Sequence, residues 1–198
     1  VVLSKSKLGP RFAEALSACW RLFDRIETPV MLYTGTAYQE GAYLHVRLLA
    51  YLQTLEILHR ELYGGSRQFP KECSWATTLA ALRNALPGEL PEELRCAISN
   101  GLSFQGGMNL VERLYDFYDR YPLCLAPIFP NRDSDMKALR DARNFLTHYT
   151  EQKKFTREFL FSTELYQMSE KTRWFVEVCL MGALGFKDNE IRELIRFF

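Results

Sequence analysis

The sequence predicts an all-α protein, and three observations support this prediction. Apolar residues recur every three or four positions through most of the 198 residues, as they do on one face of a helix. Glycine and proline separate these stretches. No stretch shows the sustained alternation of apolar and polar residues that is typical of a half-buried strand. We therefore expect residues 1–198 to form one domain, a bundle of helices.

Residues 1–42 are expected to hold a leading helix and a loop. The helical pattern runs from Arg11 to Ile26, and Thr28-Pro29 is expected to end it. The side chains that this helix is expected to contribute to the core are Phe12, Ala15, Leu16, Cys19, Trp20 and Phe23. A longer helix should follow over 43–63, with leucines on its buried face and Gly64-Gly65 as its end. Its length indicates a central member of the bundle.

The remaining elements are shorter helices and one more long helix. Three short helices are expected over 77–86, 91–104 and 109–121. The segment 122–131 contains three prolines and is expected to be a loop. Two further helices are expected over 134–149 and 163–184, with a charged break at 151–154 between them. Asp188 is expected to cap a last helix that ends near Phe198.

Composition excludes several classes of protein. The formal net charge is only +1, so attraction to nucleic acid must come from a local basic patch. The five cysteines are scattered without a CxxC pair, which argues against a disulfide framework or a zinc ribbon and favours a cytoplasmic protein. The longest apolar run, 178–186, is far below the roughly 20 residues of a membrane span. The chain begins with valine, which leaves room for a sensor domain upstream.

The three histidines, His45, His59 and His148, share no metal-binding spacing, so we expect no metal ion and no other cofactor. His59 lies near the leucine stripe of the long early helix. We expect it to be a partly buried histidine with a hydrogen-bond partner.

The stretch RNFLTHYT, residues 143–150, places an arginine, an amide and a histidine on one predicted helix. Arg143 and His148 lie beyond opposite margins of the apolar face, roughly 140° apart, with Asn144 between them. Histidine can carry a proton near neutral pH, and arginine can hold phosphate oxygens with parallel donors. These groups suit RNA cleavage, although the same spacing also fits the polar side of an ordinary helix. Two copies about a twofold axis would bring both groups to one cleft.

The pattern of Arg143, Asn144 and His148 resembles the R-x4-6-H motif of HEPN domains. The stretch YLQTLEILHREL, then ARNFLTHY, then a long apolar helix ending in ALGF is similar to the order in ApeA-like HEPN domains. The resemblance covers 43–198, the expected HEPN core, and only loosely 1–42. It implies a HEPN-type bundle with additional short helices, and the position of a C-terminal effector in a longer chain.

The resemblance also implies roles for residues of the motif. His148 would be the general acid and base, Arg143 the ligand of the phosphate and transition state, and Asn144 a positioning residue. Glu56 would orient Arg143 or His148, or else form an exposed pair with Arg60. Beside the motif, Tyr149 is a supporting candidate. The basic residues Lys153, Lys154 and Arg157 are candidates for RNA binding, or a solvated surface run.

The resemblance implies a metal-independent endoribonuclease, acting as a homodimer on RNA such as transfer RNA in antiviral, abortive-infection defence. A second hypothesis is a non-catalytic HEPN module that dimerises or binds a nucleotide through Arg143 and Asn144. A third is a plain helical interaction domain, in which all three motif positions would tolerate substitution.

Overall fold

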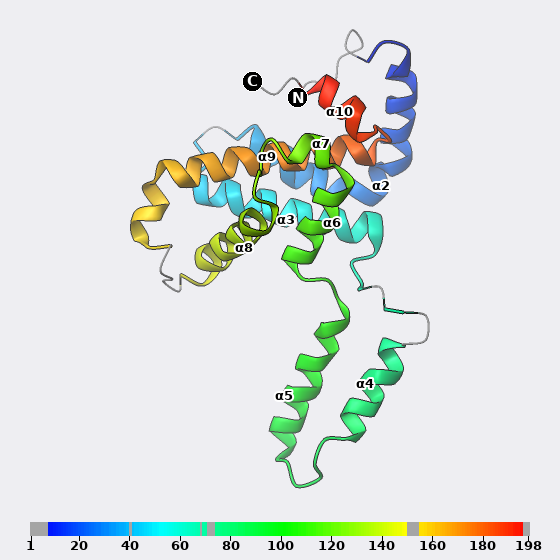
Figure 1. Cartoon of the computed structure of the whole chain (residues 1–198), viewed down its shortest axis with the longest axis vertical. Coiled ribbons are helices and arrows are strands. Elements are labelled where there is room, and N and C mark those ends of the chain that lie inside the picture. Colours follow the sequence, from blue (N-terminus) through cyan, green and yellow to red (C-terminus); the bar gives the residue numbers. More distant parts are fainter. Residues whose placement is uncertain (1–7, 40, 68, 71–73, 150–154, 196–198) are drawn as a thin grey trace.

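The computed structural model describes residues 8–39, 41–67, 69–70, 74–149 and 155–195, and all regular structure in these ranges is helical, as predicted (Figure 1). The elements in chain order are η1 (Gly9–Arg11), α2 (Phe12–Ala37), α3 (Leu44–Tyr63), α4 (Trp75–Asn84), α5 (Glu92–Ser103), η2 (Phe104–Gly106), α6 (Leu110–Arg120), α7 (Pro122–Leu125), α8 (Arg132–His148), η3 (Arg157–Phe161), α9 (Thr163–Ala183) and α10 (Asp188–Leu194). None of these helices combines the length and the apolar character needed to cross a bilayer.

Helix α3 is the centre of the bundle, as its length predicted. It packs against α2 and α9, and α6 and α8 also contact it. Figure 1 shows α3 running through the middle of the bundle with these helices around it. Leu48, Leu52, Leu55 and Leu58 are almost fully buried, whereas Leu62 is only partly buried. Gly64 ends the helix in a left-handed conformation at φ 81°. Residues other than glycine and asparagine rarely adopt this backbone conformation, which explains the glycine there.

Helix α2 corrects the first predicted boundary. The helix was expected to end at Thr28-Pro29, but it continues through Pro29 to Ala37. Proline within a helix removes one hydrogen bond at a cost of about 3 kcal/mol. Here Pro29 is buried, and beyond it Tyr33 donates a hydrogen bond of 2.5 Å to Glu177 on α9. Packing of this second half against the bundle outweighs the local preference.

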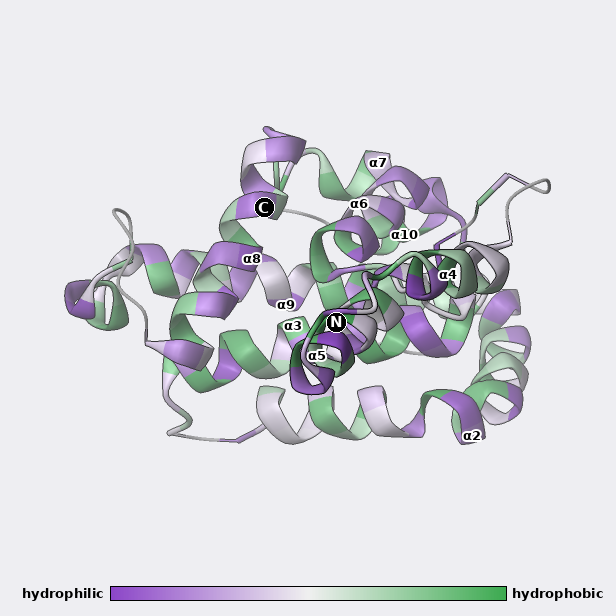
Figure 2. Cartoon of the chain, turned by 90° about the horizontal axis from the view of Figure 1, so that it is seen from below, coloured by the Kyte–Doolittle hydropathy of each residue, from purple (hydrophilic) through white to green (hydrophobic). Residues whose placement is uncertain are grey.

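The same helix also corrects the predicted core. Leu16, Cys19, Trp20 and Phe23 were expected to be buried, yet all four are exposed, Trp20 at 73%. The buried positions are Ala15, Ile26, Pro29 and Thr36. Two apolar strips lie side by side on α2, and the periodicity alone does not indicate which of them packs inward. Figure 2 shows apolar and polar residues mixed along α2 at the edge of the bundle.

Helices α4 and α5 form an arm that projects away from the other helices (Figure 1). Both were predicted to within three residues, and neither contains a buried residue. The base of the arm is closed by an isolated bridge between Ser66 and Gly107. Flanking it, the Arg67 N–H donates to the Gly106 carbonyl at 3.0 Å, and the Met108 N–H donates to the Gly65 carbonyl at 2.8 Å. The base is therefore held firmly although the arm is exposed.

A contact of Asp188 with the segment 122–131 corrects the predictions for both that segment and the last helix. The expected loop contains the short helix α7, and Asp188 caps α7 instead of its own helix. Its carboxylate accepts the N–H groups of Leu123 at 2.7 Å and Cys124 at 3.1 Å. The N-cap of α10 is Lys187, and the helix ends at Leu194, before residues 196–198, which lie outside the described ranges. The predicted cap at Asp188 was wrong because the N–H groups of α7, which it caps instead, lie far from it in sequence.

Candidate functional site

Helix α8 carries the motif in its last turns, two residues longer at the start than predicted. Its buried face includes Leu139, Ala142 and Leu146, so the helix is fixed against the bundle. It ends at His148, and Tyr149 is its C-cap, whose N–H donates to the carbonyl of Phe145 at 2.6 Å. Among the described non-glycine residues, only Tyr149 has a positive φ, of 50°. This conformation stores strain of about 1–2 kcal/mol directly beside His148.

Arg143 is held on both sides by polar side chains. Its Nη1 donates to Oδ1 of Asn144 at 3.3 Å, and its Nη2 lies 3.8 Å from Oε2 of Glu56 on α3. The Arg143 side chain is 38% exposed, so other edges of the guanidinium still face solvent. Asn144 and Glu56 thus orient the guanidinium without covering it. Of the two hypotheses for Glu56, the structure brings together the pair of Glu56 and Arg143. Arg60, the partner in the other hypothesis, lies 3.6 Å from Glu61.

His148 is exposed in the last turn of α8, and Tyr149 after it is 59% exposed. Since α8 is a regular helix over the motif, the two side chains diverge by roughly 140° around its axis. Within one copy, Arg143 therefore faces α3 while His148 points to another side. A single phosphate does not meet both groups unless a second surface closes over them.

Arg113 on α6 lies beneath Glu56, and no pattern in the sequence marked it. Its Nη1 donates to the backbone carbonyl of Glu56 at 2.9 Å, and its Nε donates to the carbonyl of Met108 at 2.9 Å. Burial lowers the pKa of the Arg113 guanidinium, although nearby Glu56 partly offsets this. Arg113 thereby fixes the turn of α3 from which Glu56 reaches Arg143.

An aromatic cluster anchors the segment that follows the motif. Phe155 and Phe159 are buried, and their rings lie 6.1 and 6.2 Å from the ring of Phe145 on α8. Arg157 lies between them in sequence and is exposed, which keeps it available as an RNA-binding candidate. The two lysines, Lys153 and Lys154, lie outside the described residues. The sequence analysis did not predict this anchor, although the four-residue spacing of the two phenylalanines could have indicated it.

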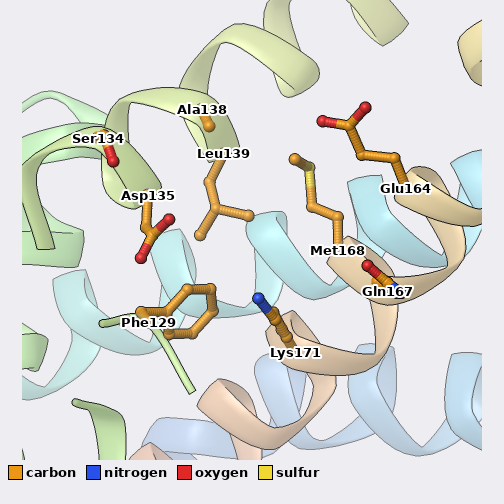
Figure 3. A pocket seen from close by; sticks show the side chains of 9 residues that line it. All are labelled: Phe129, Ser134, Asp135, Ala138, Leu139, Glu164, Gln167, Met168 and Lys171. Carbon is orange, nitrogen blue, oxygen red and sulfur yellow. The ribbon is translucent and has the colours of Figure 1, made fainter. Parts of the chain in front are cut away.

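The other side of α8 lines a separate cavity of about 260 Å³ against α9. Figure 3 shows Asp135 reaching into it from α8 and Lys171 from α9, around Phe129 and Met168. None of Arg143, Asn144 and His148 lines this cavity. The motif thus lies outside this cavity, with His148 on the exposed surface of α8.

The chemistry available at the motif is that of a fixed cation and a proton carrier. The guanidinium offers paired donors to phosphate oxygens, and the exposed imidazole can exchange protons with a ligand. Within the described ranges, no three His, Cys, Asp or Glu side chains gather where they could hold a metal ion. The side chains that the structure does bring together are Arg143, Asn144 and Glu56.

Comparison with known families agrees with the resemblance seen in the sequence. The family described as Apea-like HEPN matches residues 49–190, from the second turn of α3 to the start of α10. This range includes Glu56 and the whole motif. No curated protein and no solved structure gives a significant match. Because the matched range covers most of the chain, this protein belongs to the Apea-like HEPN family.

Proposed function

We propose that this chain is an endoribonuclease effector of antiviral defence, with Arg143, Asn144 and His148 as its active site. One observation carries the proposal. In this HEPN chain, Asn144 and Glu56 orient Arg143, and the helix that carries Arg143 also exposes His148. HEPN domains are generally associated with ribonucleases and with defence effectors. The arrangement meets the two needs of RNA cleavage, which are a proton carrier and a cation for the phosphate.

The proposed reaction is an attack of the 2′-oxygen on the adjacent phosphorus. Neutral His148 accepts the proton of the 2′-hydroxyl while the new O–P bond forms. Arg143 binds the phosphate oxygens, where negative charge accumulates. The bond from phosphorus to the 5′-oxygen then breaks, and an imidazolium returns a proton to that oxygen. The products are a 2′,3′-cyclic phosphate and a 5′-hydroxyl.

The divergence of Arg143 and His148 makes a composite site the simplest way to act on one phosphate. Two copies related by a twofold axis would place Arg143 of one beside His148 of the other. In each of the two sites, one imidazole would then accept the proton of the 2′-hydroxyl and later return it to the 5′-oxygen. A homodimer is therefore part of this proposal.

The test is cleavage of total and transfer RNA by purified protein in the presence of a chelator. We expect wild-type protein to leave cyclic phosphate and 5′-hydroxyl ends, and His148→Ala to lose at least about 100-fold in rate. His45→Ala, which removes a histidine outside the motif, is the control and should cleave normally. Persistent cleavage by pure His148→Ala protein, or complete inhibition by the chelator, would contradict the proposal.

A non-catalytic module that binds a nucleotide is the second candidate, and the divergence of the two side chains favours it. In that case Arg143 and Asn144 would hold a phosphate, and His148 would take no part. Wild-type protein would then bind but not cleave RNA. Arg143→Ala would abolish binding, whereas His148→Ala would bind like wild type.

A further inference from the structure

A second polar cluster lies away from the motif, where α3 ends. It surrounds a cavity of about 390 Å³ between the end of α3, α6 and the base of the arm. Figure 1 shows these segments meeting where the chain leaves the bundle for α4. Its volume lies within the usual range for sites that bind small molecules. None of the three motif residues lines it.

Flat side chains line this cavity, and they belong to two stacked pairs. The Arg120 guanidinium lies over the ring of Tyr63, 3.8 Å from its centroid. The ring of Phe69 stacks on Trp75, with centroids 5.5 Å apart and 10° between the planes. Planar ligands stack on phenylalanine rings and on guanidinium planes alike. Since both surfaces are already fixed, stacking would cost little side-chain ordering.

The orientation of Arg120 is fixed by a chain of hydrogen bonds that starts in the core. Its Nε and Nη2 donate to the carboxylate of Asp116 at 2.7 and 3.2 Å. Asp116 also accepts from Nε2 of His59 at 3.0 Å, and His59 is only 1% exposed. Burial lowers the pKa of His59, more than the Asp116 hydrogen bond raises it, so the imidazole is a neutral donor. The imidazole is too enclosed to react with a ligand, and its task here is support.

The charges around the cavity cancel. Arg67 pairs with Glu112 through bonds of 3.0 and 3.1 Å, as Arg120 pairs with Asp116. Burial raises the pKa of each carboxyl, but hydrogen bonds from the arginines and other donors outweigh it, so both pKa values are lowered and both groups are ionised at neutral pH. The two cations and two anions that line the cavity carry no net charge, so they offer little attraction to a free phosphate. Their unused N–H groups and lone pairs suit a neutral ring with donors and acceptors on its edge.

We propose that this cavity binds a nucleobase, stacked against Phe69 or Arg120, with its polar edge toward Arg67 and Glu112. That the base belongs to an unpaired nucleotide of RNA rests on the function proposed above. Glu56, which contacts Arg143, and Tyr63, which supports Arg120, are seven residues apart on α3, about 10 Å along its axis. A strand that reaches the motif can therefore also reach this cavity.

The indole N–H of Trp75 provides a direct NMR probe, because Trp75 supports Phe69 at the cavity. The protein is ¹⁵N-labelled and carries His148→Ala to prevent cleavage, and Trp75→Phe assigns the resonance. The ligands are the four nucleoside 5′-monophosphates and the hexanucleotides of A, C and U, with inorganic phosphate as the control. A shift with monophosphates identifies a site for free nucleotides, and a shift with hexanucleotides alone identifies a base within a strand. Both outcomes support the proposal, whereas no shift with either, or an equal shift with phosphate, overturns it.

Two variants locate the bound base. Phe69→Leu should weaken binding roughly 5- to 100-fold, the effect of losing one stacked base. Arg120→Lys keeps the charge but loses the flat surface, and should also weaken binding. The matched control is Phe23→Leu, since Phe23 is exposed to the same extent, 37% against 38%, but lies on α2 outside the cavity. Equal affinity of Phe69→Leu and Phe23→Leu would refute the proposal.

Cleavage by wild-type protein is measured separately from this binding. If no ligand shifts the Trp75 resonance but the wild-type protein cleaves RNA normally, only the nucleobase site in this cavity is rejected. A normal shift without any cleavage would reject only the proposed nuclease.

Discussion

Glu56 Oε2 lies 3.8 Å from Nη2 of Arg143 and joins the centre of α3 to the motif on α8. Both side chains are about one third exposed, so the pair contributes only about 0–1 kcal/mol to folding. Its larger effect is geometric. A carboxylate beside the guanidinium, with Asn144 on the other side, limits the orientations in which Arg143 can meet a phosphate.

Replacing Glu56 should therefore affect activity more than stability. We expect Glu56→Gln to lower the rate of RNA cleavage by about 10-fold, because the guanidinium loses its charged anchor, and to leave the melting temperature nearly unchanged. Single-turnover kinetics and calorimetry measure the two effects. Glu61→Gln is the control, since the Glu61 carboxylate lies 3.6 Å from the neighbouring Arg60. Wild-type rates in Glu56→Gln would show that this contact has no positioning role.

A mixture of two inactive variants tests the composite site. Arg143→Ala and His148→Ala should each be inactive alone, but after mixing and exchange of subunits about half of the dimers are mixed. Each mixed dimer holds one site with both an intact Arg143 and an intact His148, so about a quarter of the wild-type activity should return. Mixing two preparations of the same variant is the control. No recovery after verified exchange would mean that each site takes both residues from one copy.

Stability should fall in mild acid because of His59. Burial, which outweighs the hydrogen bond that His59 donates to Asp116, lowers its pKa below the usual value of about 6.5, and Arg113 and Arg120 add to the lowering. The unfolded chain then binds a proton at a higher pH than the folded chain does. The stabilising contribution is thus complete above about pH 6.5 and is lost as pH falls toward the folded pKa, at up to about 1.4 kcal/mol per pH unit.

The free energy of unfolding, measured in urea between pH 7.5 and 5, reveals this loss. His59→Gln keeps a donor for Asp116 but does not titrate, so its stability should decrease less with falling pH. His45→Gln is the control and should follow wild type. The same slope in His59→Gln and wild type would exclude His59 as the cause.

Gly182 on α9 should tolerate no side chain. A Cβ at this position would overlap the hydroxyl of the buried Tyr121, which sits directly against the helix. We expect Gly182→Ala to destabilise the protein by about 1–3 kcal/mol through overpacking. Gly101→Ala on α5 is the matched control, because a Cβ there meets nothing within 4 Å. It should stabilise the protein by about 0.4–1 kcal/mol, and equal melting temperatures of the two variants would contradict this account.

Local patterns were reliable wherever one helix face dominated. The stripe of leucines gave α3 to within one residue, and the apolar pattern of 134–149 gave α8 to within two. Prediction failed where a distant contact decided the outcome. Pro29 lies inside a helix because the residues after it pack on the bundle, and Trp20 is exposed because a neighbouring strip of α2 packs inward.

The sequence by itself determined the helical class, the family and the position of the motif on one helix, because helical periodicity and motif spacing are properties of neighbouring residues. Only the tertiary structure decided that Glu56 reaches Arg143 and that Asp188 caps α7. It alone also brought Asp116 to His59 and closed the cavity beside the arm. These contacts join residues 57 to 87 positions apart in the sequence. Such pairings depend on how whole helices pack, which no local pattern specifies.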